Sequence, residues 1–219
     1  MNIVILAAGK GVRMRSALPK VLHPLAGQPM LSHVLATARH FSPAVLAIVY
    51  GYGGDQVIRH FSADTDIQWV NQAVQLGTGH ALQQAMPRLN PAYPVLVLYG
   101  DVPGISTSTL SKLISQASSD RVVLLTADLP DPTGYGRIIR DKDGNVCAIV
   151  EEKDADAFQK AVHEINTGIL IAPYVHLNRW LSRLDNHNAQ QEYYLTDVIK
   201  MAADEGIEVT TVQPDNLFE

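Results

Sequence analysis

Several features that mark particular protein classes are scarce in this sequence. Its 219 residues include a single cysteine, Cys147, so neither an internal disulfide framework nor a cysteine-rich zinc site is expected. Charged residues make up only 18%, too few for a disordered chain or a coiled coil. The longest apolar runs, such as residues 44–50, are far shorter than a bilayer span, and the N-terminus lacks the basic and apolar segments of a signal peptide. We therefore expect a cytoplasmic protein without a membrane-spanning segment.

The charge balance also argues against one class of partner. Seventeen basic residues face 22 acidic ones, for a net charge of −5, and no basic stripe runs along the chain. Binding to nucleic acid is therefore not expected. The hydrophobic content of 47% and the length suit one α/β domain with a substantial core.

Short β-branched runs alternate with helical patterns in the first 130 residues. The runs predict buried strands at 3–7, 45–50, 67–70, 95–99 and 122–127. Helical spacing of apolar residues predicts helices at 30–40, 54–60, 79–86 and 106–117. This alternation predicts a doubly wound, mainly parallel sheet.

A different order of elements is predicted after residue 130. The Asp143-Gly144 pair indicates a hairpin between strands 137–140 and 145–150. The remaining elements are expected to be helices at 154–162 and 174–184, strands at 165–171 and 208–212, and a helix from the N-cap Thr196 to Gly206. No internal repeat or linker interrupts the chain, so we expect one domain with a nucleotide-binding half and a second half that closes the site.

The first candidate binding motif follows the first predicted strand. The segment Leu6-Ala7-Ala8-Gly9-Lys10-Gly11-Val12-Arg13-Met14 leads from small residues into a glycine loop, whose backbone can approach an anion closely. It is neither a P-loop nor a dinucleotide fingerprint, because Met14 stands where each of those motifs requires glycine. Arg13 and Lys20 provide two cations suited to phosphate. The alternative is an ordinary glycine turn with surface cations.

Two further motifs follow later strands. Asp101 comes after the strand at 95–99, where a carboxylate can hold Mg²⁺ against nucleotide phosphates; alternatively it caps a helix or forms a turn. Gln72 and the Gly77-Thr78 pair suit the polar edge of a pyrimidine, and Thr78 can also be a helix N-cap.

The second half offers polar groups for a sugar. Gly136, Glu151 and Asn166 suit sugar hydroxyls and an acetamido group, although each alone fits a structural role better. No His-Glu-x-x-His zinc motif and no Gly-x-Ser-x-Gly nucleophile elbow is present in the sequence. Phosphoryl-group transfer fits this lack of a nucleophile, since it depends mainly on positioning and charge neutralisation.

Together these motifs resemble a known family. The chain resembles the N-terminal domain of bacterial bifunctional N-acetylglucosamine-1-phosphate uridyltransferase/glucosamine-1-phosphate acetyltransferases. Besides the motifs above, the segments that carry this resemblance are Pro19-Lys20, Gln75 to Ala81, Tyr99 to Pro103, Asp131 to Arg137, Glu164 to Ile169 and Glu192 to Asp197. The resemblance covers the whole chain. It implies a Rossmann-like fold of the nucleotide-diphospho-sugar transferase type, with a β-hairpin in the sugar-binding half.

The resemblance also implies roles for individual residues. The uracil and ribose would contact the backbone of Leu6, Ala7, Ala8 and Gly9 and the groups of Gln72, Gly77 and Thr78. Arg13 and Lys20 would bind the phosphates, and Tyr99, Gly100 and Asp101 would lie along the nucleotide, with Asp101 on Mg²⁺. The catalytic residues would be Arg13, Lys20 and Asp101. N-acetylglucosamine would contact Gly136, Glu151 and Asn166, and its phosphate would approach Tyr194 and Thr196.

The activity implied by the resemblance is a uridylyl transfer. UTP and N-acetylglucosamine 1-phosphate would give UDP-N-acetylglucosamine and pyrophosphate, with Mg²⁺ as cofactor. The family's second metal ligand, an asparagine, and its left-handed β-helix acetyltransferase domain would lie beyond Glu219, so we expect a fragment of a longer, homotrimeric protein. The alternatives are a cytidylyl- or guanylyltransferase of the same fold, or a catalytically silent sensing module.

Overall fold

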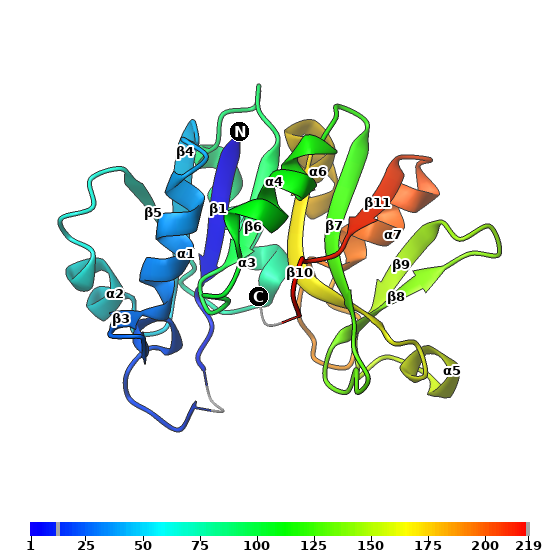
Figure 1. Ribbon diagram of the computed structural model, residues 1–219, viewed down its shortest axis with the longest axis horizontal. Coiled ribbons are helices and arrows are strands. Elements are labelled where there is room, and N and C mark those ends of the chain that lie inside the picture. Colours follow the sequence, from blue (N-terminus) through cyan, green and yellow to red (C-terminus); the bar gives the residue numbers. More distant parts are fainter. Residues whose placement is uncertain (12–13, 218–219) are drawn as a thin grey trace.

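The centre of the molecule is a nine-stranded sheet (Figure 1). The computed structural model describes residues 1–11 and 14–217. Along the sheet the main strands follow the order β5 (Ile67–Asn71), β4 (Val45–Tyr50), β1 (Asn2–Ala7), β6 (Val95–Tyr99), β10 (Glu164–Ala172), β7 (Arg121–Asp128) and β11 (Glu208–Val212). The neighbours β5–β4, β4–β1, β1–β6 and β7–β11 are parallel, whereas β10 is antiparallel to both β6 and β7. The predicted mainly parallel sheet is therefore confirmed.

Helices cover both faces of the sheet, because successive side chains on each buried strand point in opposite directions. On one face lie α1 (Met30–Arg39), α2 (Gly54–His60) and α4 (Thr107–Ser115), and on the other α3 (Thr78–Ala85), α6 (Tyr174–Leu181) and α7 (Asp197–Asp204) (Figure 1). In β1, Ile3 and Ile5 pack on the first face and Val4 and Leu6 on the second. The doubly wound arrangement is therefore confirmed as well.

The predicted hairpin is present beside the end of β10. It consists of β8 (Gly136–Arg140) and β9 (Val146–Val150), and β8 pairs with β10. Its turn contains Gly144 at φ +86°, and the Asp141 carboxylate accepts the backbone N–H groups of Asp143 and Asn145, both at 2.9 Å. The remaining short elements are η2 (Lys20–Leu22), β2 (Pro24–Leu25), β3 (Gln28–Pro29) and η3 (Met86–Arg88).

The prediction of a helix at 154–162 is wrong in its length. Only α5 (Ala157–Lys160) is helical, and it begins after Asp156, whose carboxylate accepts from Gln159 N at 2.8 Å in a capping box. Asp154 lies outside the helix because its carboxylate accepts the backbone N–H of Ala189, 35 residues later in the chain, at 2.8 Å. A long-range contact has therefore overridden a local helical pattern.

Strand β10 contains an irregularity that affects the site. Its register shifts between Asn166 and Leu170, where Gly168 adopts φ +90° and donates its N–H to the Asn166 side-chain oxygen at 3.0 Å. A Cβ at Gly168 would lie 2.5 Å from the Tyr99 ring. The absence of a side chain at this position lets the last residue of β6 pack against β10.

We predict that Gly168→Ala destabilises the protein more than Gly144→Ala does. Both glycines have φ near +90°, but a Cβ at Gly144 would have nothing within 4 Å. Gly144→Ala should cost only backbone strain, about 1–2 kcal/mol, whereas Gly168→Ala adds an overpacking cost of about 1–3 kcal/mol. Urea denaturation of the two variants tests this. Equal losses in the free energy of unfolding would show that Tyr99 yields without cost.

Candidate active site

A cavity of about 720 Å³ opens at the carboxyl ends of β1 and β6. The chain passes from β1 to β4 and β5 on one side and then crosses to β6 on the other, so this is the topological switch point of the sheet, where open α/β sheets bind ligands. Its lining comes from the loop after β1, the start of α3 and the ends of β5 and β6. Ten predicted site residues line it: Leu6, Ala7, Ala8, Gly9, Lys20, Gln72, Gly77, Thr78, Tyr99 and Asp101.

The loop after β1 forms one wall of the cavity. Gly11 has φ +57°, and a Cβ there would lie 2.9 Å from the Lys20 Cβ, so glycine allows the two segments to meet. Gly100 donates its N–H to Leu6 O at 2.9 Å and packs under the loop rather than lining the cavity. Arg13 lies outside the described residues.

Polar groups at one end of the cavity are tightly organised. Gln72 is only 2% exposed, and its Nε2 donates to Gly77 O at 3.1 Å and contacts His80 Nδ1 at 2.9 Å. Gly77, at φ +113°, occupies the N-cap position of α3, so the prediction of Thr78 as N-cap is wrong. The Thr78 hydroxyl instead accepts the backbone N–H of Leu195 at 3.1 Å.

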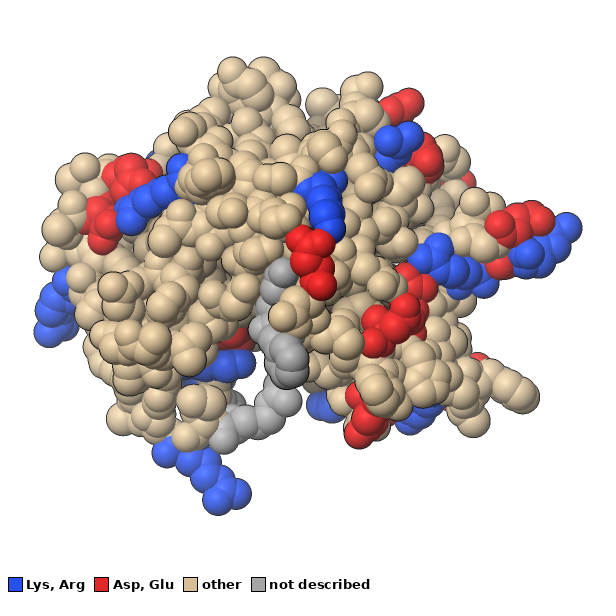
Figure 2. Space-filling view, viewed as in Figure 1, with Lys and Arg blue, Asp and Glu red and all other residues tan. Residues whose placement is uncertain are grey.

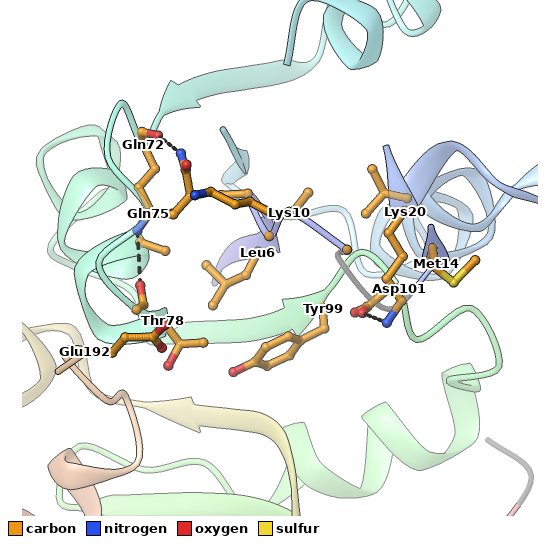
Figure 3. Close-up of a pocket in the computed structure, with 17 residues that line it drawn as sticks. Leu6, Lys10, Met14, Lys20, Gln72, Gln75, Thr78, Tyr99, Asp101 and Glu192 are labelled. Carbon is orange, nitrogen blue, oxygen red and sulfur yellow. Dashed lines mark hydrogen bonds and ion pairs between the residues drawn. The ribbon is translucent and has the colours of Figure 1, made fainter. Parts of the chain in front are cut away.

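The opposite end of the cavity carries a cation and an anion. Lys20 Nζ lies 2.5 Å from Asp101 Oδ2, and the two side chains are 36% and 28% exposed. Figure 3 shows this pair and the Gln72–Thr78 group at opposite ends of the cavity, with Tyr99 between them. The site therefore has a hydrogen-bonding end and an ion-paired end.

Tyr99 connects the cavity to the second half of the molecule. Burial and the negative charges of Glu151 and Asp101 raise its pKa. Gly136 and Asn166 are direct partners in the β8–β10 pairing, and a Cβ at Gly136 would lie 3.5 Å from both Glu151 carboxylate oxygens. The three residues expected to hold the sugar are thus close together, although none of them lines the cavity itself.

Two predicted residues beside Glu151 have other partners. Tyr194 is buried, and its hydroxyl donates to Asp154 at 3.2 Å and accepts from Gln190 at 2.9 Å. Thr196 occupies the N-cap position of α7, but its hydroxyl donates to Glu151 Oε1 at 3.1 Å instead of capping the helix. Neither lines the cavity. Burial raises the pKa of Glu151, and this hydrogen bond opposes the shift.

Comparison with known proteins gives the geometry a family context. The family model described as "MobA-like NTP transferase domain" matches residues 3–197. The chain belongs to the MobA-like NTP transferase family. Within the part of this NTP transferase domain that the structure describes, no helix is long and apolar enough to cross a membrane.

Similar sequences and structures agree with that assignment. The chain is 57% identical over all of its residues to "Bifunctional protein GlmU" of Cupriavidus metallidurans and 58% identical to that of Paraburkholderia phymatum, and it spans 48% of each. The resemblance drawn from the motifs is therefore confirmed, and the chain spans about half the length of these relatives.

Two solved structures share the fold of this NTP transferase domain. A UDP-glucose pyrophosphorylase complexed with UDP-glucose superimposes with a TM-score of 0.76 at 16% identity, covering 97% of this chain and 89% of that one. A putative glucose-1-phosphate thymidylyltransferase from Bacillus anthracis gives 0.75 at 19% identity, with 98% and 87% covered. At these identities the likeness concerns the fold alone.

The ion-paired end of the NTP transferase cavity fits a magnesium ion only in part. Among the described residues, no three His, Cys, Asp or Glu side chains come together as a metal site. Magnesium in nucleotide enzymes usually takes one or two carboxylates, with phosphates and waters as its other ligands. Asp101 can supply one such carboxylate at the cavity wall, so it suits an ion that arrives with the nucleotide.

The sequence reasoning missed several lining residues. These are Lys10, Gly11, Met14, Val21, Gln75, Ala81 and Glu192. Lys10 and Gly11 lay within the recognised loop and could have been included on that basis. Glu192 lay within a segment that carried the family resemblance, but it reaches the cavity only because the residues after it pack against the start of α3.

The acidic residues beside Glu151 lead to a prediction about pH. Burial and the charges of Asp185, Glu151 and Asp154 raise the pKa of Asp197 from 3.8 to about 6. The folded state therefore holds this proton more tightly than the unfolded state, and stability present below about pH 4 is lost as the pH rises to about 6.

We predict that Asp197→Asn removes this loss. The variant should match the wild type at pH 4 and exceed its free energy of unfolding by about 1 kcal/mol at pH 8, after allowance for solvent screening. Asp143→Asn, in the exposed hairpin turn, changes the net charge equally and should show no such difference. Urea denaturation at both pH values is the measurement. A variant no more stable than wild type at pH 8 would contradict the charge argument.

Proposed function

We propose that this chain transfers a uridylyl group from UTP to N-acetylglucosamine 1-phosphate. The observation that carries the proposal is the single cavity at the switch point, with a hydrogen-bonding end for a base and an ion-paired end for phosphates. The 57% identity to bifunctional GlmU proteins supports it over the entire chain. The products would be UDP-N-acetylglucosamine and pyrophosphate.

The base and ribose would occupy the end of the cavity near Gln72. The backbone of Leu6 to Gly9 would contact the nucleoside, and Gln72 with the Gly77-Thr78 backbone would contact the edge of the uracil. Gly77 presents its backbone to the cavity. Its φ of +113° is a conformation that residues with a side chain rarely adopt, so glycine is needed at this position. A site that pairs with the uracil edge leaves polar groups unpaired when cytosine is bound.

The phosphates would occupy the end near Lys20 and Asp101. Lys20 would pair with phosphate oxygens, and Asp101 would hold Mg²⁺, which neutralises phosphate charge when bound. Arg13 would contact the departing pyrophosphate. Tyr99 and Gly100 would lie along the nucleotide between the two ends.

N-acetylglucosamine 1-phosphate would bind beyond Tyr99. Gly136, Glu151 and Asn166 would contact the sugar, and Tyr194 and Thr196 would support this region. A phosphate oxygen of the sugar phosphate attacks the α-phosphorus of UTP in line, and the bond to the β-phosphate oxygen breaks as pyrophosphate leaves. The reaction requires no protein nucleophile, which agrees with the absence of such a motif from the sequence.

The proposal also covers the extent of the domain and the cell compartment in which it acts. We take residues 1–219 as one nucleotidyltransferase domain that acts in the cytoplasm. The acetyltransferase activity and homotrimer implied by the family resemblance would concern longer proteins of this kind. The closest alternative remains a cytidylyl- or guanylyltransferase of the same fold, with different base and sugar pockets.

Pyrophosphate release tests this function directly. We expect release from UTP only when N-acetylglucosamine 1-phosphate and Mg²⁺ are present, with smaller rates for CTP, GTP and glucose 1-phosphate. Each polar group of the base left unpaired by CTP should cost about 1–3 kcal/mol. Equal kcat/KM for UTP and CTP would favour the alternative, and no release with any nucleotide would favour a sensing module.

We also predict that Lys20→Met lowers kcat far more than it weakens UTP binding. Negative charge develops on the leaving pyrophosphate as the bond breaks, so a cation there contributes most in the transition state. The loss should be about 10²-fold or more, and Arg13→Ala should behave in the same way. Lys112→Met removes a surface lysine paired with Asp215 and is the control. A higher KM with unchanged kcat would show that Lys20 serves binding alone.

A further inference from the structure

The side-chain amide of Gln72 is held in one orientation. Its Nε2 lies 3.1 Å from Gly77 O and 2.9 Å from His80 Nδ1, so both of its N–H groups are used. Gly77 O can only accept a hydrogen bond, so the amide atom beside it must be the nitrogen. Within the described part of the chain, no group donates to Gln72 Oε1, and Gln72 lines the cavity. The amide therefore offers an acceptor to whatever binds there.

This orientation determines the protonation state of His80. Because Gln72 donates to His80 Nδ1, that nitrogen must carry a lone pair, and the ring proton must be on Nε2. The Gln84 side chain reaches Nε2, with its amide 3.3 Å away. The same amide nitrogen donates to the backbone oxygen of His80, also at 3.3 Å, so it stays toward His80 and the Nε2 proton has no acceptor on Gln84.

We propose that His80 sets the base selectivity of the cavity by holding Gln72 with its amide oxygen toward the ligand. His80 is a positioning residue, since it does not line the cavity itself. The inference rests on the proposed nucleotide site. An acceptor at Gln72 pairs with the N3–H of uracil, whereas cytosine presents a lone pair at the equivalent atom. The neutral imidazole thus transmits a preference for uracil through one hydrogen bond.

Protonation of His80 would remove that preference. A proton on Nδ1 would face the N–H of Gln72, so the amide would have to turn over or move away. A turned amide would place its oxygen against Gly77 O, an acceptor facing an acceptor at the present separation of 3.1 Å. Neither arrangement presents Oε1 to the base with the same support.

The surroundings of His80 keep it neutral at ordinary pH. Burial lowers the pKa of His80. Among the described residues, no charged group on the surrounding elements β1, β4, β5 and α6 or in residues 185–196 changes that pKa further. The groups that face its ring are Gln72, Gln84 and the titratable Tyr193, whose ring centroid is 6.3 Å away. Loss of selectivity is therefore expected only on the acid side.

Two substitutions separate the hydrogen bond from the shape of the ring. His80→Phe keeps an aromatic ring but removes the acceptor, and should lower the ratio of kcat/KM for UTP to that for CTP by about three- to tenfold. His80→Asn can place its Oδ1 near the position of Nδ1 and should retain the ratio within about a factor of two. The exposed His60, on α2, provides the controls His60→Phe and His60→Asn, which should leave the ratio unchanged.

Two further measurements do not depend on turnover. Calorimetric binding of UTP and CTP by the wild-type chain should show the preference for UTP falling between about pH 8 and about pH 5, and His80→Asn should not show this fall. Long-range ¹H–¹⁵N correlation spectra should show His80 protonated on Nε2 and not on Nδ1 at pH 8. The calorimetry and the spectra of the wild-type chain remain valid if a variant folds poorly.

The outcomes separate the two proposals. If the wild type binds UTP and CTP equally, the proposed base site fails. If the wild type prefers UTP but His80→Phe keeps the full preference, the proposed role of His80 is wrong. It is also wrong if His80→Asn loses as much of the preference as His80→Phe does. An Nδ1–H tautomer at pH 8 would also overturn the inference. A preference lost only in His80→Phe and at acid pH supports it.

Discussion

The parallel pairing of β1 with β6 is the constraint on which the candidate site depends. Leu6 lies opposite Tyr99 in this ladder, and Gly100 N–H continues it by donating to Leu6 O at 2.9 Å. The pairing aligns the carboxyl ends of two strands that are about 90 residues apart in sequence. The glycine loop after β1, Tyr99 and Asp101 then line one cavity. A register shift would separate Asp101 from Lys20 and dismantle the ion-paired end.

A second contact closes the other end of the cavity. Residues 193–195 pack along the start of α3, where Tyr193 accepts the N–H of Gly79 at 2.8 Å and donates its own N–H to Leu76 O at 2.8 Å. A Cβ at Gly77 would lie 2.6 Å from Tyr193 O, and one at Gly79 would lie 2.9 Å from the same atom. Backbone packing therefore explains why both Gly77 and Gly79 are glycine. The same contact brings Glu192 to the cavity.

Apolar patterning predicted the sheet well because each buried strand reports its own environment. The runs at 45–50 and 95–99 match β4 and β6 at both ends, since burial on both faces requires an uninterrupted apolar segment. Patterning failed where a side chain bonds to a group far away in the sequence. Asp154 leaves its predicted helix for Ala189, and the Thr196 hydroxyl bonds Glu151 instead of capping α7. The motif residues around β1 and β6 were found because glycines and charges directly after strands are local features. Glu192 depends on a contact between remote segments and could not be found in this way.

Surface charge plays a different role from the charges in the cavity. Acidic and basic side chains are interspersed on the face shown in Figure 2, and exposed pairs such as Arg183–Glu205 contribute little to stability. In the cavity several polar groups already have defined partners: Lys20 pairs with Asp101, and the amide nitrogen of Gln72 with Gly77 and His80. Groups held in this way lose little further conformational entropy when a ligand binds. Tyr99 packs against the second half of the molecule, because Gly168 has no side chain and leaves room for the Tyr99 ring between β6 and β10. The hydrogen-bonding end, the ion-paired end and the expected sugar region are thus joined by one connected set of contacts, which suits the proposed reaction, because that reaction depends on in-line alignment rather than on a protein nucleophile.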